Sequence, residues 1–349
     1  MANLKTVVVT GASGFIAKHI IAQLLELGFA VRGTLRSQAK IPQVRQSISE
    51  MVAKPAFQRF SLFTCDLLSD TGWAEAMLGA DGVMHVATVV PMKEPKVRDD
   101  VIRPAIEGTQ RVMGFAHSAG ISRIIMTSSI AAIGYGVKND KGTVRFTEAD
   151  WTSVEGLKGT WAYPEAKVRS EVLAWETAKR NGVRLTTVCP SMVFGPAVDA
   201  DTSASLEIVR RVLAGKVPAM PPGGIGVVDV RDVANIHVAA FLNPTSAGRR
   251  VIANAQYMEF IAIARLLGAN YPEVKVPGRA APKWLLRFLG RFDRTIRQIS
   301  ADLDTIRLYD GSYGAELMGR DYRTPEEATI SAAESLYELG IVKHPSRKR

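Results

Sequence analysis

The sequence predicts an α/β protein with a doubly wound parallel sheet and a smaller, mainly helical C-terminal part. Short β-branched or apolar runs alternate with segments of helical periodicity as far as Phe194, which is the rhythm of β–α–β units. The rhythm breaks after Gly195 and Pro196, and beyond Asn254 most segments have helical spacing. With 349 residues and 47% hydrophobic content, the chain can bury a full core.

The first expected element is a buried strand over residues 6–10, followed by a glycine turn and a helix. The turn contains Gly11 and Gly14, and apolar residues then recur at helical spacing until Gly28 ends the helix. Gly11 permits a tight turn, Gly14 lets a pyrophosphate approach, and the helix N-terminus offers N–H groups to the anion. This order is the context that a dinucleotide fingerprint requires. It predicts a Rossmann-type nucleotide site, the alternative being a glycine turn without a ligand.

The second strand is expected at residues 30–35, and the charges that follow it bear on cofactor choice. NAD-binding enzymes usually carry an acidic residue at the end of this strand to hold the ribose 2′-hydroxyl. The segment AVRGTLRSQAK has none, whereas Arg36 follows the strand and Lys40 lies a turn further on. A guanidinium suits a 2′-phosphate. The sequence therefore favours NADP(H), unless both side chains are ordinary solvated charges.

A later apolar strand at residues 124–126 ends in the hydroxyl run TSS at residues 127–129, and Tyr163 and Lys167 follow downstream. Ligands bind beyond the carboxyl ends of the strands in such sheets, so these hydroxyls are expected at the site. Tyr163 and Lys167 share one helix face. An ammonium beside a phenol lowers the pKa of the tyrosine. Tyr163 can then donate its proton to a substrate oxygen while hydride reaches the carbon.

These motifs together resemble the extended short-chain dehydrogenase/reductase superfamily. Within it, the chain is most similar to the dihydroflavonol 4-reductases, cinnamoyl-CoA reductases and aldehyde or methylglyoxal reductases. The matching stretches are VTGASGFIAKHI, VRGTLRS, CDLLSD, VMHVAT, VIRPAIEGT, IIMTSSIAA, YPEAKVRSE, CPSMVFGP, VDVRDVANIHVAA and ELMGRDYRTPEEA.

The resemblance implies a role for each matching residue. It places Ser13, Gly14, Phe15 and Ile16 at the pyrophosphate, Asp66 and Leu67 at the adenine, Val86, Ala87 and Thr88 at the nicotinamide ribose, and Pro190 and Val193 at the nicotinamide. It implies Ser129 as the catalytic serine, with Ser128 beside it on the cofactor side. Tyr163 and Lys167 would also contact the cofactor, Lys167 through the nicotinamide ribose. Gly134 stands where plant dihydroflavonol reductases have an asparagine, which disfavours a dihydroflavonol substrate.

The expected function is NADPH-dependent reduction of an apolar aldehyde or ketone to an alcohol. The residues expected to line the substrate pocket are Val89, Val90, Met92, Ile130, Trp161, Met192 and Met220. An epimerase, dehydratase or 3β-hydroxysteroid dehydrogenase on the same scaffold is the first alternative. A non-catalytic nucleotide sensor is the second, although such proteins tend to lose Tyr163 or Lys167.

The chain is expected to form two interleaved parts. Residues 1–194 and 227–253 are assigned to the nucleotide-binding domain, 195–226 and 254–341 to the substrate-binding part, and 342–349 to a basic tail. Residues 227–230 are expected to return to the sheet, and a capping box at residues 324–327 to open a helix that ends at Gly340. Residues 279–297 read as an amphipathic helix, whose apolar side is expected to cover the substrate pocket rather than a membrane.

Composition limits the partners and the compartment. The net charge is +10, but basic residues are dispersed apart from 279–297 and the tail, so nucleic acid is not expected. No apolar run is long enough to span a membrane, and residues 1–5 are too short for a signal region. Cys65 and Cys189 are expected to be free thiols in a reducing, cytoplasmic setting. No metal-ligand cluster is evident, His85 is expected in the core, and the chain is expected to be a monomer or homodimer.

Overall fold

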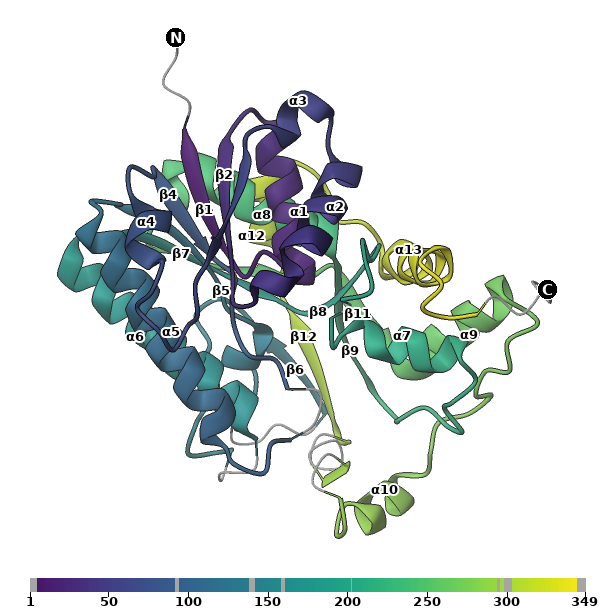
Figure 1. Cartoon of the computed structure of the whole chain (residues 1–349). Helices are drawn as coiled ribbons and strands as arrows, with labels where there is room; N and C mark the ends of the chain where they lie inside the picture. The colour runs from purple at the N-terminus through teal and green to yellow at the C-terminus, as the bar shows by residue number, and fades with distance from the viewer. Residues whose placement is uncertain are drawn as a thin grey trace.

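The fold is described from a computed structural model, which covers residues 5–91, 94–137, 142–157, 161–201, 203–293, 296–297 and 303–343. Its centre is a seven-stranded sheet with the order β10-β7-β5-β4-β1-β2-β3 (Figure 1). All neighbouring pairs in this sheet are parallel. The strands are β1 (Thr6–Thr10), β2 (Ala30–Leu35), β3 (Phe60–Thr64), β4 (Gly82–His85), β5 (Arg123–Thr127), β7 (Arg184–Pro190) and β10 (Arg250–Ala253).

The order of the strands locates the ligand site. The chain runs outward from β1 through β2 to β3, then crosses back to β4 on the other side of β1. Doubly wound sheets bind their ligands at this switch point, beyond the carboxyl ends of the strands. The doubly wound α/β class predicted from the sequence is therefore confirmed.

Helices cover both faces of the sheet (Figure 1). One layer contains α1 (Phe15–Glu26), α2 (Ile41–Met51), α8 (Val230–Leu242) and α12 (Ser312–Met318), and the other contains α4 (Trp73–Met77), α5 (Asp99–Ser118) and α6 (Ala162–Asn181). Because successive side chains of a strand point to opposite faces, Val7 and Val9 join the core beneath α1 and α8, whereas Val8 joins the core beneath α5 and α6.

Two smaller sheets lie outside the main one. The first contains β8 (Met192–Phe194), β9 (Gly224–Asp229) and β11 (Gln256–Glu259), and α7 (Leu206–Leu213), α9 (Phe260–Asn270) and α13 (Pro325–Glu338) pack around it. The second pairs β6 (Gly142–Phe146) with β12 (Thr305–Tyr309) in parallel. The short elements are α3 (Lys54–Phe57), α10 (Lys283–Leu289), η1 (Gln38–Lys40), η2 (Ile130–Ala132) and η3 (Pro244–Ser246).

The expectation that residues 227–230 return to the main sheet is wrong. They belong to β9 and the start of α8, and β9 pairs with β8 and β11. The place beside β7 is taken by β10 instead. A β-branched run predicts a buried strand, but it does not specify the partner. The proposed division into two parts remains a prediction.

The helix expected over residues 279–297 is shorter than predicted in the described part of that segment. The helix α10 covers only Lys283–Leu289, between Pro282 and Gly290, and buries none of its residues. Trp284 is 69% exposed and Phe292 78% exposed, and the expectation that this segment covers the substrate pocket remains a prediction.

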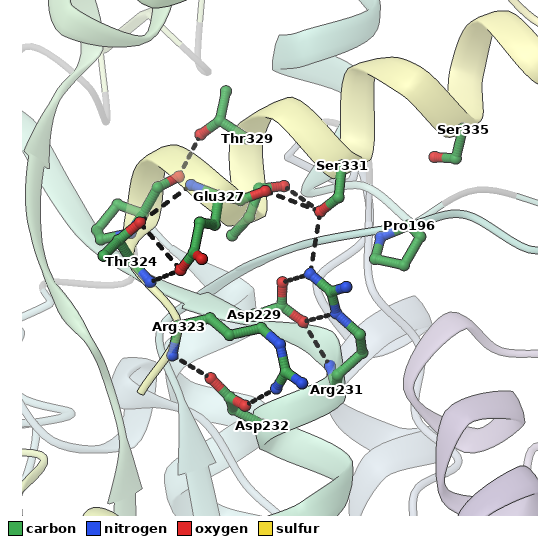
Figure 2. Close-up of polar contacts among 12 residues, drawn as sticks. Pro196, Asp229, Arg231, Asp232, Arg323, Thr324, Glu327, Thr329, Ser331 and Ser335 are labelled. Carbon is green, nitrogen blue, oxygen red and sulfur yellow. Dashed lines mark hydrogen bonds and ion pairs between the residues drawn. The ribbon is translucent and has the colours of Figure 1, made fainter. Parts of the chain in front are cut away.

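Buried carboxylates tie the C-terminal helix α13 to the start of α8 (Figure 2). Asp229 accepts hydrogen bonds from the guanidinium of Arg231, at 2.9 and 2.7 Å, and Arg231 also donates to the Ser331 hydroxyl at 3.3 Å. Asp232 accepts from the Arg323 backbone N–H at 2.7 Å and pairs with the Arg323 guanidinium. These contacts link α13 and the residue before its N-cap to the start of α8.

The predicted capping box at the start of α13 is confirmed. The Thr324 hydroxyl accepts from the Glu327 N–H at 3.1 Å, and the Glu327 carboxylate accepts from the Thr324 N–H at 2.8 Å (Figure 2). Among the described residues, no helix has both the length and the apolar content needed to cross a bilayer.

Candidate active site

The glycine turn lies at the switch point of the sheet. Gly11 has a φ of +72°, and a Cβ there would lie 3.0 Å from the Cα of Ala87, which follows β4. Glycine therefore meets both a backbone requirement and a close approach. The Gly14 N–H donates to the Gly11 carbonyl at 2.8 Å, and α1 begins at Phe15. The N–H groups of the first turn have no partner within the helix, so they are available to an anion near Ser13 and Gly14.

Thr10 and His85 hold the ends of β1 and β4 together beside this turn. The Thr10 Oγ1 accepts from the N–H groups of Val86 and Ala87, at 3.0 and 2.9 Å. Its own proton is then free for His85 Nδ1, 3.0 Å away, which leaves Nε2–H facing the Thr109 hydroxyl at 3.4 Å. Burial lowers the pKa of His85 to about 3, in keeping with a neutral ring. The expectation that His85 is a core residue is confirmed.

The residues expected at the adenosine end follow β2 and β3. Arg36 is exposed directly after β2 and has no hydrogen-bond or ion-pair partner among the described residues. Lys40 instead forms an ion pair with Asp201 at 2.5 Å. Asp66 follows β3, and its carboxylate accepts from the Leu68 N–H at 2.8 Å. Leu67 packs against Gly108 of α5.

The three residues expected to be catalytic come together where β5 ends beside α6. The Ser129 side chain lies close enough to the phenol of Tyr163 to lower its pKa. The Ser129 Oγ also accepts from the Ala131 N–H at 3.1 Å and so caps the turn η2. Lys167 Nζ donates to the Thr127 carbonyl at 3.0 Å and lies 6.0 Å from the centre of the Tyr163 ring. The i, i+4 spacing on α6 therefore places phenol and ammonium side by side.

Burial controls the protonation of this group. It lowers the pKa of Lys167 to about 8, although the nearby Glu171 carboxylate opposes the shift. The expectation that the Lys167 ammonium lowers the pKa of Tyr163 is wrong here: burial raises this pKa, and the nearby Ser129 side chain opposes the shift. Tyr163 therefore holds its proton at neutral pH, as a proton donor must.

The polar groups behind Lys167 did not emerge from the sequence as site residues. Glu171 is fully buried one turn further along α6 and accepts from the hydroxyls of Ser128 and Thr187, at 2.5 and 2.7 Å. It also forms an ion pair with Arg250 of β10 at 2.8 Å. The spacing from Lys167 to Glu171 was a visible signal, because it repeats the interval from Tyr163 to Lys167. Arg250 had no such signal, because only the fold brings it there.

Pro190 and Val193, expected at the nicotinamide, lie at the end of β7 and in β8. Pro190 pairs with Ala253 of β10, and the Ser191 N–H donates to the Ala253 carbonyl at 3.0 Å. Ser128 is held on the same edge, since its N–H donates to the Val188 carbonyl at 2.7 Å.

The predicted substrate residues are not all gathered at one place. Trp161 is half-buried two residues before Tyr163, and its ring meets Tyr135 edge-on at 4.9 Å. Both rings belong to the apolar cluster that includes Tyr163. The other predicted residues are Val89 and Met192, which are half-buried, Val90, which is exposed, Ile130 and Met220, which are buried in the core, and Met92, which lies outside the described residues.

The space beside Gly134 is already filled by another side chain. A Cβ at Gly134 would lie 2.6 Å from the hydroxyl oxygen of Tyr309, which comes from β12. A cavity of about 520 Å³ lies between β6, β12 and the start of α12, with Phe146 and Tyr309 in its wall. The residues around it do not include Ser129, Tyr163 or Lys167.

Residues 7–254 match the NAD dependent epimerase/dehydratase family. The chain belongs to this family. The membership predicted from the motifs is confirmed. The relatives of this chain include several reductases. The chain is 30% identical to an anthocyanidin reductase ((2S)-flavan-3-ol-forming) of Vitis vinifera, over 78% of this chain and 83% of that protein. It is 33% identical to cinnamoyl-CoA reductase CAD2 of Medicago truncatula, over 80% of this chain and 85% of that protein.

Two solved structures share the fold over nearly the whole chain. The yeast methylglyoxal/isovaleraldehyde reductase Gre2, crystallised with NADPH, covers 96% of this chain and 99% of its own at a TM-score of 0.79 and 24% identity. Gre2 of Candida albicans in complex with NADPH gives the same coverage, a TM-score of 0.76 and 25% identity. The likeness to the yeast enzyme shows the fold, including the C-terminal part.

Proposed function

We propose that this chain is an NADPH-dependent carbonyl reductase that converts an aldehyde or ketone into an alcohol. The observation that carries the proposal is the convergence of Ser129, Tyr163 and Lys167 at the carboxyl edge of the sheet, beside the switch point. The reductase names of its relatives support it, as do the NADPH complexes of the Gre2 structures.

Each of the three side chains has a distinct task in the proposed reaction. Bound NADPH supplies a hydride to the carbonyl carbon. Tyr163 donates its phenolic proton to the carbonyl oxygen, and the Ser129 hydroxyl hydrogen-bonds to the same oxygen. The Lys167 ammonium stabilises the phenolate that remains, which then regains a proton from solvent. The product is the alcohol, and the tyrosine returns to its neutral form.

The residues present fit a phosphorylated dinucleotide. Gly11 lets the turn lie against Ala87 without a side chain between them, and the first turn of α1 offers N–H groups to a pyrophosphate. Arg36 is exposed after β2, where a 2′-phosphate would lie. Because Lys40 forms an ion pair with Asp201, we expect it to contribute less than Arg36 to binding the 2′-phosphate. Asp66, Leu67, Thr88 and Val193 complete the proposed cofactor contacts.

An apolar carbonyl compound is the proposed substrate class. The rings of Trp161 and Tyr135 lie in the same cluster as Tyr163 and offer an apolar wall beside the proton donor. Each further methylene buried there contributes about 0.8 kcal/mol. Catalytic efficiency is therefore expected to rise along a series of longer or aromatic aldehydes until the pocket is full.

The test is NADPH oxidation with this aldehyde series, alongside dihydroquercetin and a set of sugar nucleotides. We expect turnover of the aldehydes and poor turnover of dihydroquercetin, because Gly134 and Tyr309 stand where a polar flavonoid contact would be. Turnover confined to sugar nucleotides would favour an epimerase or dehydratase and overturn the proposal.

A further inference from the structure

A buried ion pair lies directly behind the Lys167 ammonium. Glu171 is one helical turn beyond Lys167 on α6, and Arg250 reaches it from β10. The Arg250 Nε donates to Glu171 Oε1 at 2.8 Å, and Nη2 donates to Oε2 at 3.2 Å, so the guanidinium grips the carboxylate with both ends. The side chain of Glu171 is 0% exposed and that of Arg250 is 7% exposed.

Every N–H of the Arg250 guanidinium has an acceptor. Besides Glu171, Nη1 donates to the carbonyls of Glu148 and Asp150, at 3.0 and 2.5 Å, and Nη2 donates to the Ala132 carbonyl at 3.4 Å. The guanidinium also stacks on Trp151, 3.9 Å from the ring centre. Arg250 thus binds the turn η2, which Ser129 caps, to the helix that carries Tyr163. A buried charge with all its donors satisfied has a fixed geometry.

Glu171 extends this network to Ser128, which follows β5 and precedes Ser129. It accepts from the Ser128 hydroxyl at 2.5 Å, from Thr187 at 2.7 Å and from the Trp175 indole at 3.3 Å. Without a cation of its own, a carboxylate at i+4 would pair with Lys167. The guanidinium of Arg250 satisfies Glu171 and leaves the Lys167 ammonium directed at Thr127 and Tyr163.

We propose that Glu171 and Arg250 are positioning residues for the reduction, which hold Ser128 and Ser129 in place and keep Lys167 facing Tyr163. The inference rests on the proposed carbonyl reductase function. The proposal also gives Glu171 and Arg250 an electrostatic role. When Lys167 is charged, the side chains of Lys167, Glu171 and Arg250 together carry one net positive charge, which favours the Tyr163 phenolate.

The other titratable groups around Lys167 hold one protonation state near neutral pH. From β4, His85 has a pKa lowered by burial to about 3, and from α8, His237 has one lowered to about 4. From β7, the Cys189 thiol has a pKa raised by burial to about 12. The pH dependence above neutrality therefore belongs to the coupled pair Tyr163 and Lys167, under the charges of Glu171 and Arg250.

The experiment is the pH profile of aldehyde reduction in Arg250→Met and Glu171→Gln. Loss of proton donation sets the basic limb of this profile. Removing the Arg250 cation raises the apparent pKa and moves the limb to higher pH, whereas removing the Glu171 anion moves it to lower pH. We expect shifts of about half a pH unit or more in opposite directions. The double variant should return close to the wild-type limb.

Three controls keep the inference separate from folding and from the proposed function. Arg249→Met changes the neighbouring, exposed arginine and should leave the limb in place. Arg250→Lys retains the positive charge but loses the bidentate guanidinium contact. It should therefore lower kcat without moving the basic limb of the pH profile. The phenolate of Tyr163, titrated by ultraviolet difference against Tyr163→Phe without cofactor, should shift in the same directions.

Each outcome has one meaning. Unmoved limbs, or shifts of the same sign in Arg250→Met and Glu171→Gln, would overturn the inference while the reductase function stands. If Arg250→Met does not fold, the Glu171→Gln limb and the kcat of Arg250→Lys decide the question. A wild-type enzyme without aldehyde reduction, or a fully active Tyr163→Phe variant, would instead refute the proposed function.

Discussion

Arg36 is the residue on which we expect cofactor preference to depend. It is exposed at the end of β2, and no acidic residue in the segment 30–40 competes for the adenosine ribose. Arg36→Ala should remove a charge-assisted contact with the 2′-phosphate, which contributes on the order of 1.5–3 kcal/mol. The KM for NADPH should therefore rise about 10- to 150-fold, and the KM for NADH should hardly change.

The matched control for this prediction is Lys40→Ala. Lys40 is paired with Asp201, so its loss should affect the KM for NADPH less than the loss of Arg36. Steady-state kinetics with both cofactors provides the measurement. Equal use of NADH and NADPH by the wild-type enzyme would contradict the assignment.

At the scale of single elements, Thr324 should stabilise α13 through its capping box. Replacing an N-cap threonine by alanine leaves the Glu327 N–H without its partner and typically costs about 1 kcal/mol. We expect Thr324→Ala to lower the free energy of unfolding by that amount in urea denaturation, with NADPH affinity retained. Thr324→Ser keeps the hydroxyl and should behave as wild type, and an unchanged midpoint in the alanine variant would refute the role of the cap.

Elements specified by local signals were predicted closely. The strands β1 and β2 have the bounds expected from the sequence, because β-branched runs and glycine turns act over a few residues. Local signals did not reveal pairings between distant segments. The partner of β9 and the pairing of β6 with β12 depend on which edges remain open once the main sheet has formed.

The same distinction applies to the candidate site. Sequence motifs mark the glycine turn, the hydroxyl run that contains Ser129 and the Tyr163–Lys167 spacing. The structure brings these motifs to one edge of the sheet. Arg250 lies 79 residues from Glu171, and only the packing of β10 beside β7 joins them. The substrate contacts remain predictions: Trp161 lies in the cluster of Tyr163, whereas Met220 is fully buried in the core.

At the scale of the whole molecule, stability should decrease as the pH falls below neutrality. Burial lowers the pKa of His19, His85 and His237 from 6.5 to about 4, 3 and 4. Below pH 6.5 the unfolded chain takes up protons that the folded chain does not, so the free energy of unfolding falls with pH until the folded pKa is reached. Each histidine contributes a slope of up to about 1.4 kcal/mol per pH unit in this window.

His237→Gln should make this pH dependence shallower. The variant removes one buried imidazole, whose Nδ1 donates to the Val233 carbonyl at 2.7 Å and whose Nε2 accepts from Thr127 at 2.7 Å. Urea denaturation between pH 7 and pH 4.5 gives the slope. His117 is exposed, so His117→Gln is the control. Identical slopes in wild type and His237→Gln would show that His237 also binds a proton in the folded state.

If Tyr163 supplies the proton in an NADPH-dependent reduction, the variant Tyr163→Phe should lack the general acid while keeping the cofactor site. NADPH binding and aldehyde turnover should be measured on the same preparation, with Lys167→Ala alongside. We expect Tyr163→Phe to bind NADPH as wild type does but to lose roughly a hundredfold or more of its turnover, because the general acid is gone. Lys167→Ala should lose both turnover and cofactor affinity. Substantial turnover by Tyr163→Phe would contradict the account.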